Sequence, residues 1–161
     1  MLLTTLKSLS ETDQTRCEAY IAANESYRAT AYDDATGLRV KAPRGNLTIG
    51  HGINLDAGMS VDESMALLTN RLCIAEDDIL NSSVLRFYTS LSTVRKVVML
   101  DLTYNLGLAS LLGFKNFLYC MSTQSYDNAA ADLQDSAYFN QVHDRAIRNQ
   151  LMIKTNAWTS S

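Results

Sequence analysis

Strand-forming residues and glycines are concentrated in one part of this chain, residues 25–59, whereas both flanks carry helical spacing. Five of the seven glycines fall in this segment, where they separate short runs of Tyr, Thr, Val and Ile. Such runs are typical of short antiparallel strands joined by turns. Because the strands are confined to one region instead of alternating with helices, the pattern predicts an α+β fold with a small N-terminal antiparallel sheet.

The chain on either side of this segment is predicted to be helical. Ser10 opens the first helix, and Ser60 with Glu63 has the spacing of an N-terminal capping box. Apolar residues then recur every three or four positions from Val61 to Ile79 and from Val94 to Leu106, as on the buried face of a helix. Shorter helices are predicted over residues 114–122, 125–133 and 144–155.

Length and composition indicate one globular domain over residues 1–161. We expect a sheet lobe over about 25–59, a helical lobe over about 60–158 that also includes the first helix, and a ligand cleft between the two. The net charge of -3 gives no sign of nucleic-acid binding. The three cysteines are few, odd in number and far apart, which predicts reduced and mostly buried thiols.

Candidate catalytic carboxylates flank the start of the sheet segment. Glu25 closes the first predicted helix, Asp33 and Asp34 end a predicted strand, and Thr48 follows on the next strand. Two carboxylates facing one groove are what glycosidic bond cleavage requires, one as a proton donor and one to support water or positive charge. Taken alone, the same residues also fit an ordinary solvated surface, where most acidic side chains lie.

A series of motifs in fixed order makes the resemblance to a known family specific. They are Glu25, Tyr32-Asp33-Asp34, Gly37, Thr48-Ile49-Gly50-His51-Gly52, Leu102-Thr103-Tyr104-Asn105-Leu106-Gly107, Gly113-Phe114-Lys115-Asn116, Arg145-Ala146-Ile147-Arg148 and Thr155-Asn156-Ala157-Trp158. The match as a whole covers about residues 17–158. The chain resembles the phage-type, T4-like lysozymes of glycoside hydrolase family 24, and the resemblance implies a lysozyme-like fold.

The resemblance also implies a reaction and its residues. It makes Glu25 the general acid, Asp34 the second carboxylate, Thr48 a residue that holds the attacking water, and Arg145 the partner that orients Glu25. The reaction is hydrolysis of the β-1,4 bond between N-acetylmuramic acid and N-acetylglucosamine, which lyses bacterial cells. The implied substrate-binding residues are Asn54, Tyr104, Asn105, Phe117 and Asp132.

We expect a monomer that acts on peptidoglycan without a cofactor. We also expect no metal site, because neither His51 nor His143 has a further ligand at metal spacing. We expect no nucleic-acid partner and no stable membrane association, because no apolar stretch approaches bilayer length. The first residues are too short and polar for a secretory signal, so we expect synthesis in the cytoplasm and action in the periplasm. A holin or a secretion system would then give access to the wall.

Two features depart from the family pattern, and two alternative functions stay open. Residues 38–47 are longer than the corresponding turn and carry the basic side chains Arg39, Lys41 and Arg44, so we expect a longer hairpin. His51 lies between the two glycines, where strand alternation turns it away from Thr48. The alternatives are a lytic transglycosylase acting on the same substrate and a catalytically inactive domain that binds the cell wall.

Overall fold

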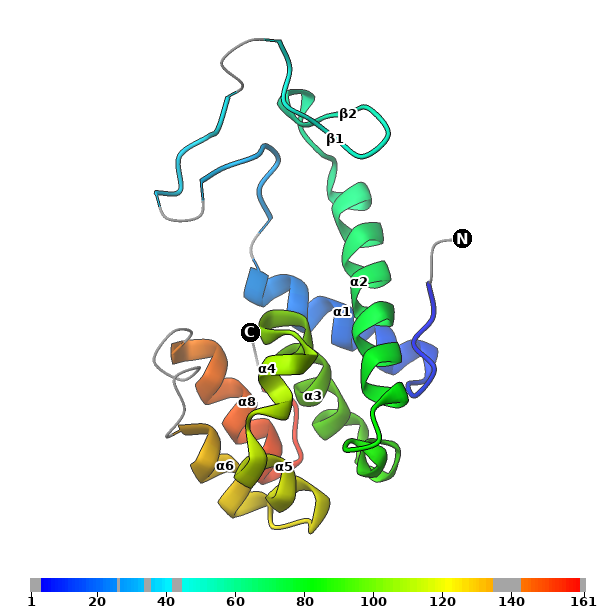
Figure 1. The fold of residues 1–161 in the computed structure, drawn as a ribbon, viewed down its shortest axis with the longest axis vertical. Coiled ribbons are helices and arrows are strands. Elements are labelled where there is room, and N and C mark those ends of the chain that lie inside the picture. Colours follow the sequence, from blue (N-terminus) through cyan, green and yellow to red (C-terminus); the bar gives the residue numbers. More distant parts are fainter. Residues whose placement is uncertain (1–3, 26, 34–35, 42–44, 135–142, 160–161) are drawn as a thin grey trace.

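The computed structural model describes residues 4–25, 27–33, 36–41, 45–134 and 143–159. The elements, in chain order, are α1 (Glu11–Glu25), β1 (Thr48–Ile49), β2 (Ile53–Asn54), the 3-10 helix η1 (Leu55–Ala57), α2 (Val61–Asn81), the 3-10 helix η2 (Arg86–Ser90), α3 (Thr93–Leu106), α4 (Leu108–Leu112), α5 (Lys115–Ser122), α6 (Tyr126–Gln134) and α8 (His143–Thr155) (Figure 1). Over these residues the protein is mostly helical with one small antiparallel sheet of two strands, the type of sheet that the sequence predicted.

Helix α3 forms the centre of the core. The run from Val97 to Thr103 is buried along its whole length, and α3 packs against α1, α2, α4 and α8. Ser92 caps the start of the helix by accepting a hydrogen bond from the backbone N–H of Arg95. Gly107 ends it with φ at 78°, which places the glycine in a conformation that side-chain-bearing residues avoid. The predicted stop at Gly107 is therefore confirmed.

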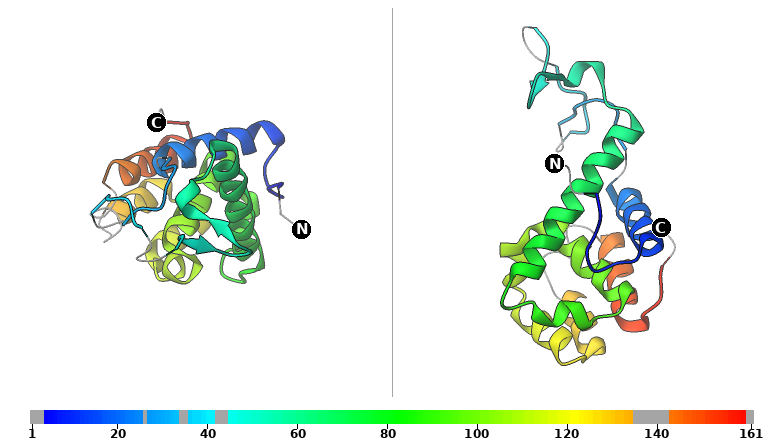
Figure 2. Two further views of the ribbon diagram at one scale, coloured as in Figure 1. Left: turned by 90° about the horizontal axis from the view of Figure 1, so that it is seen from above. Right: turned by 90° about the vertical axis from the view of Figure 1, so that its right-hand side faces the viewer.

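Helix α2 connects the small sheet to the helical core. Its N-terminus is closed by the predicted capping box, in which Ser60 and Glu63 exchange hydrogen bonds. At a rise of about 1.5 Å per residue, this 21-residue helix is roughly 30 Å long. Its fully buried residues begin at Leu72, so the first half of α2 extends from the core toward the strands (Figures 1 and 2).

The sheet is much smaller than the strand-forming composition of residues 25–59 suggested. Thr48 pairs with Asn54 and Ile49 with Ile53, and one isolated bridge joins Tyr32 to Arg39. Ile49 and Ile53 are more than half exposed. Strand propensity alone does not sustain a long strand, because a sheet of two strands needs an apolar face to pack against.

Backbone and polar contacts hold this segment to the start of α2. The backbone N–H of Met59 donates to the carbonyl of Ala29 at 2.7 Å. A Cβ at Gly58 would lie only 2.9 Å from that carbonyl oxygen, so the close approach requires glycine. Farther along, Asp56 accepts the N–H of Leu47 through its side chain and the guanidinium of Arg39 through its carbonyl.

The cysteines are unpaired, and Cys17 and Cys73 are buried, as the sequence predicted, while Cys120 is half-buried. Burial raises the pKa of all three thiols above the ordinary range. Among the helices of the described residues, none is both long and apolar enough to cross a bilayer.

Candidate functional site

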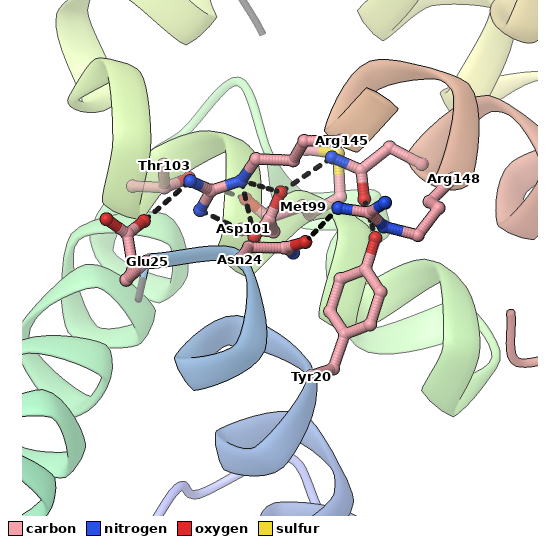
Figure 3. A network of polar contacts seen from close by, with 9 residues as sticks. Tyr20, Asn24, Glu25, Met99, Asp101, Thr103, Arg145 and Arg148 are labelled. Carbon is pink, nitrogen blue, oxygen red and sulfur yellow. Dashed lines mark hydrogen bonds and ion pairs between the residues drawn. The ribbon is translucent and has the colours of Figure 1, made fainter. Parts of the chain in front are cut away.

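Glu25 is the last residue of α1, and its side chain is fixed on one side only. Oε1 accepts a hydrogen bond from Nη1 of Arg145 at 2.5 Å, across 120 positions of the chain (Figure 3). The Glu25 side chain is 37% exposed, whereas that of Arg145 is 7% exposed. The carboxyl group is therefore held in a defined orientation while part of it still faces solvent.

Arg145 is itself fixed by a buried carboxylate on α3. Asp101 is fully buried and accepts hydrogen bonds from Nη2 of Arg145 at 2.8 Å and from its Nε at 3.1 Å. Asn149 donates to the other Asp101 oxygen at 2.6 Å, and the Tyr20 hydroxyl donates to Asn149 at 2.8 Å. This polar network, which we call the Asp101–Arg145 network, runs from the middle of α1 through α3 and α8 back to Glu25 (Figure 3).

The charges of the network determine what each member can do. Burial lowers the pKa of Arg145, but the hydrogen bonds and negative charge of Asp101, followed by those of Glu25, outweigh it and raise the pKa. Burial and then the charge of Asp101 raise the pKa of Tyr20 to about 12, so its hydroxyl remains a neutral donor. When Glu25 carries a proton and is neutral, the positive charge of Arg145 is matched by the negative charge of Asp101 alone.

A second contact ties the end of α1 to α8. Nη2 of Arg148 donates to Oδ1 of Asn24 at 2.5 Å, directly beside the contact between Glu25 and Arg145 (Figure 3). Arg145 and Arg148 are three positions apart and therefore share one face of α8. Two neighbouring residues at the end of α1 are thus oriented by two arginines of the same helix.

Glu25 borders two pockets, of about 210 and 410 Å³, and Arg71 and Tyr104 line both of them with it. The first pocket is mainly apolar and is completed largely by Met59 and by the first half of α2, including Val61, Met65, Leu67 and Leu68. The second includes polar side chains of α2 and α3, among them Asp78, Thr103 and Asn105. A carboxyl group at the junction of an apolar and a polar pocket is suited to a sugar ring, which presents both kinds of surface.

Tyr104 lies half-buried on α3 beside Glu25. Burial raises the pKa of its phenol, and the negative charge of Glu25 raises it further. The hydroxyl therefore keeps its proton at neutral pH and can donate a hydrogen bond into either pocket. Asn105, the next residue, is exposed and lines the second pocket.

The structure brings together four of the predicted site residues, namely Glu25, Tyr104, Asn105 and Arg145. Asp34 lies outside the described residues.

Thr48 and Asn54 face each other in the two-stranded sheet, and neither lines either of the two pockets described above. The Thr48 hydroxyl donates to the Asn46 carbonyl at 3.2 Å, and the Asn54 side chain accepts the N–H of Asp56 at 3.0 Å.

Phe117 and Asp132 lie away from these pockets. The Phe117 side chain is 1% exposed and belongs to the hydrophobic core, because α5 turns its apolar face inward. Asp132 is half-buried on α6, where it accepts a weak hydrogen bond from the thiol of Cys120 at 3.8 Å. Because the Phe117 side chain is buried in the core, it does not reach a saccharide in this structure. We therefore leave Phe117 out of the candidate site.

The sequence analysis missed several residues of the site, among them Asp101, Asn149 and Arg71. Asp101 carried a usable signal, because it interrupts a continuous apolar run from Val97 to Leu102, and a buried carboxylate requires a charged or hydrogen-bonding partner. Asn149 and Arg71 carried no comparable signal, since polar residues at their positions also fit the exposed side of a helix.

Comparisons with known proteins support the family. No family model matches the chain. Two curated proteins of Dictyostelium discoideum do: "Probable T4-type lysozyme 1", 26% identical over 112 residues, and "Probable T4-type lysozyme 2", 28% identical over 105 residues. The first match covers 66% of this chain and of the relative, and the second covers 62% of each. The chain therefore spans less than two thirds of the length of these relatives. The chain is therefore similar to proteins named as probable T4-type lysozymes over a little less than two thirds of its length.

Proposed function

We propose that this protein is a peptidoglycan hydrolase that cleaves the β-1,4 bond between N-acetylmuramic acid and N-acetylglucosamine and thereby lyses bacterial cells. The observation that carries the proposal is the placement of Glu25, which is held by a buried arginine and borders two pockets. The names of the curated relatives, both probable T4-type lysozymes, support the same reaction class.

In the proposed reaction, Glu25 donates a proton to the glycosidic oxygen of the leaving sugar. A general acid acts efficiently only when its oxygen is held within hydrogen-bond reach of the atom it protonates. The contact from Arg145 restrains Glu25 through one oxygen and leaves the other available to the substrate (Figure 3). After proton transfer, the new negative charge on Glu25 lies next to the guanidinium, which stabilises it.

We assign the second carboxylate of the reaction to Asp34 and the positioning of the attacking water to Thr48. The neighbouring Asp33 has a different task, because its side chain accepts the N–H of Thr36 at 3.1 Å and its backbone makes two hydrogen bonds with Gly37 and Leu38. These contacts close the turn that follows Asp33. Asp33 is therefore a structural residue in this proposal.

We further propose that residues 25–59 form one wall of a substrate cleft and that the helical part of the protein forms the other. The first half of α2, which lines the apolar pocket, would then connect the two walls. A long polymer such as peptidoglycan needs an open groove, and the two pockets next to Glu25 would form part of that groove.

The mass of the released products tests the proposal. Purified protein is incubated with insoluble peptidoglycan, and the soluble fragments are analysed by mass spectrometry. Hydrolysis adds one water per bond cleaved, so we expect fragments with a free reducing muramic acid. Fragments that end in 1,6-anhydromuramic acid would show a lytic transglycosylase instead. Binding to the wall without soluble fragments would show an inactive binding domain.

A further inference from the structure

Arg71 is a cation at the junction of the two pockets. It lies on α2, is exposed, and lines both pockets together with Glu25 and Tyr104. Within the described residues, its guanidinium makes no ion pair or hydrogen bond. Arg145 and Arg148, in contrast, donate to Glu25 and Asn24 and are held in place by them.

The charges around Arg71 leave it available to a ligand. Its positive charge is close enough to Tyr104 to oppose part of the rise in the pKa of the phenol that burial causes. Glu25, the acidic group that borders both pockets, is already paired with Arg145. Asp78 lines the second pocket two turns farther along α2 but forms no ion pair with Arg71 within 4.0 Å. Among the residues that the structure describes, no carboxylate therefore compensates the guanidinium at the pocket junction.

We propose that Arg71 is a specificity-determining residue that binds a carboxylate of the peptide attached to the muramic acid next to the cleaved bond. This inference rests on the proposed function. The sugar chain of peptidoglycan is uncharged where its lactyl groups are linked to peptide, so the peptide supplies the carboxylates of the repeating unit. A guanidinium recognises a carboxylate through two parallel hydrogen bonds, which favours this group over neutral parts of the polymer.

The expected effect is a change in apparent affinity. The peptide carboxylate takes no part in bond cleavage. Its interaction is therefore the same in the ground state and in the transition state, which lowers KM and leaves kcat unchanged. For an exposed pair with good geometry, removing it should raise KM by roughly threefold to tenfold.

The test combines a change in the protein with a change in the substrate. Peptidoglycan is used as isolated and after its peptide carboxylates have been converted to methylamides with carbodiimide and methylamine. KM is measured on both substrates for the wild type, for Arg71→Gln and for Arg86→Gln. Arg86 is a matched control, because it is also an exposed arginine but lies on η2 and lines neither pocket.

Amidation should raise KM for the wild type and for Arg86→Gln by roughly threefold to tenfold more than for Arg71→Gln. An equal effect of amidation on the wild type and on Arg71→Gln would overturn the proposal.

Co-sedimentation with the two insoluble substrates gives a second readout that needs no cleavage. If the wild type cleaves neither substrate but its binding falls on amidation and that of Arg71→Gln does not, the proposed function fails and the role of Arg71 stands. If the wild type cleaves normally and the two proteins respond alike to amidation, the role of Arg71 fails and the proposed function stands.

Discussion

Replacing Asp101 with asparagine is the sharpest perturbation of the network behind Glu25. The side chain keeps its size, but the fully buried carboxylate that accepts from Arg145 and Asn149 is lost. Removing one partner of a buried ion pair typically costs about 3–5 kcal/mol, since the other charge remains buried. Glu25 still compensates part of the Arg145 charge, so we expect a loss near the lower end, about 3 kcal/mol in the free energy of unfolding.

Urea unfolding followed by circular dichroism measures this loss. A domain of this size has a stability of about 5–15 kcal/mol, so the variant should remain folded at low temperature. The control is the double variant Asp101→Asn, Arg145→Met, in which both buried charges are absent. We expect it to recover part of the stability lost in Asp101→Asn, because no uncompensated charge is left in the core. A loss below about 1 kcal/mol for Asp101→Asn, or no recovery in the double variant, would refute the reasoning.

The neighbouring aspartates should differ in their effect on the reaction: Asp34→Ala should lose most of the rate at which reducing ends are released from peptidoglycan. Asp33→Ala should keep most of it, because Asp33 serves the turn; the opposite order would show that the carboxylate is misassigned. Phe117→Ala should destabilise the protein by about 3–5 kcal/mol in urea unfolding, because it opens a cavity in the core. It should leave KM for peptidoglycan unchanged, and a raised KM with normal stability would return Phe117 to the substrate site.

The helices were the part of the fold that the sequence predicted well. The capping box at Ser60 and the stop at Gly107 are confirmed, because both depend on hydrogen bonds and backbone conformations within a few residues. Strand content was overestimated, because Ile49 and Ile53 have high strand propensity but no apolar surface to cover them. Sequence signals within a few residues therefore predicted the helix ends correctly. They failed for the strands, because strand length depends on burial against other parts of the chain.

The candidate site depended on information that local spacing does not contain. Glu25 and Arg145 are 120 positions apart, and their pairing was predicted from the motif resemblance and not from helical periodicity. The resemblance fixes positions along the chain but not the direction of each side chain, which explains why Phe117 was placed in the groove. Asp101 was overlooked because the stripe on α3 was interpreted as core packing, although a charged residue inside such a stripe signals a buried partner.

The central claim is that Glu25 supplies the proton for bond cleavage, and Glu25→Gln tests it most directly. The amide oxygen of glutamine can still accept from Arg145, so the fold should be retained, which a circular dichroism melt verifies. Glu11→Gln is the matched control, because Glu11 lies at the opposite end of α1.

The measurement is the initial rate at which each protein releases reducing ends from purified peptidoglycan. We expect Glu25→Gln to be slower than the wild type by a factor on the order of a hundred or more, because the proton donor is gone, and Glu11→Gln to match the wild type. A folded Glu25→Gln protein that cleaves peptidoglycan at close to the wild-type rate would contradict the account.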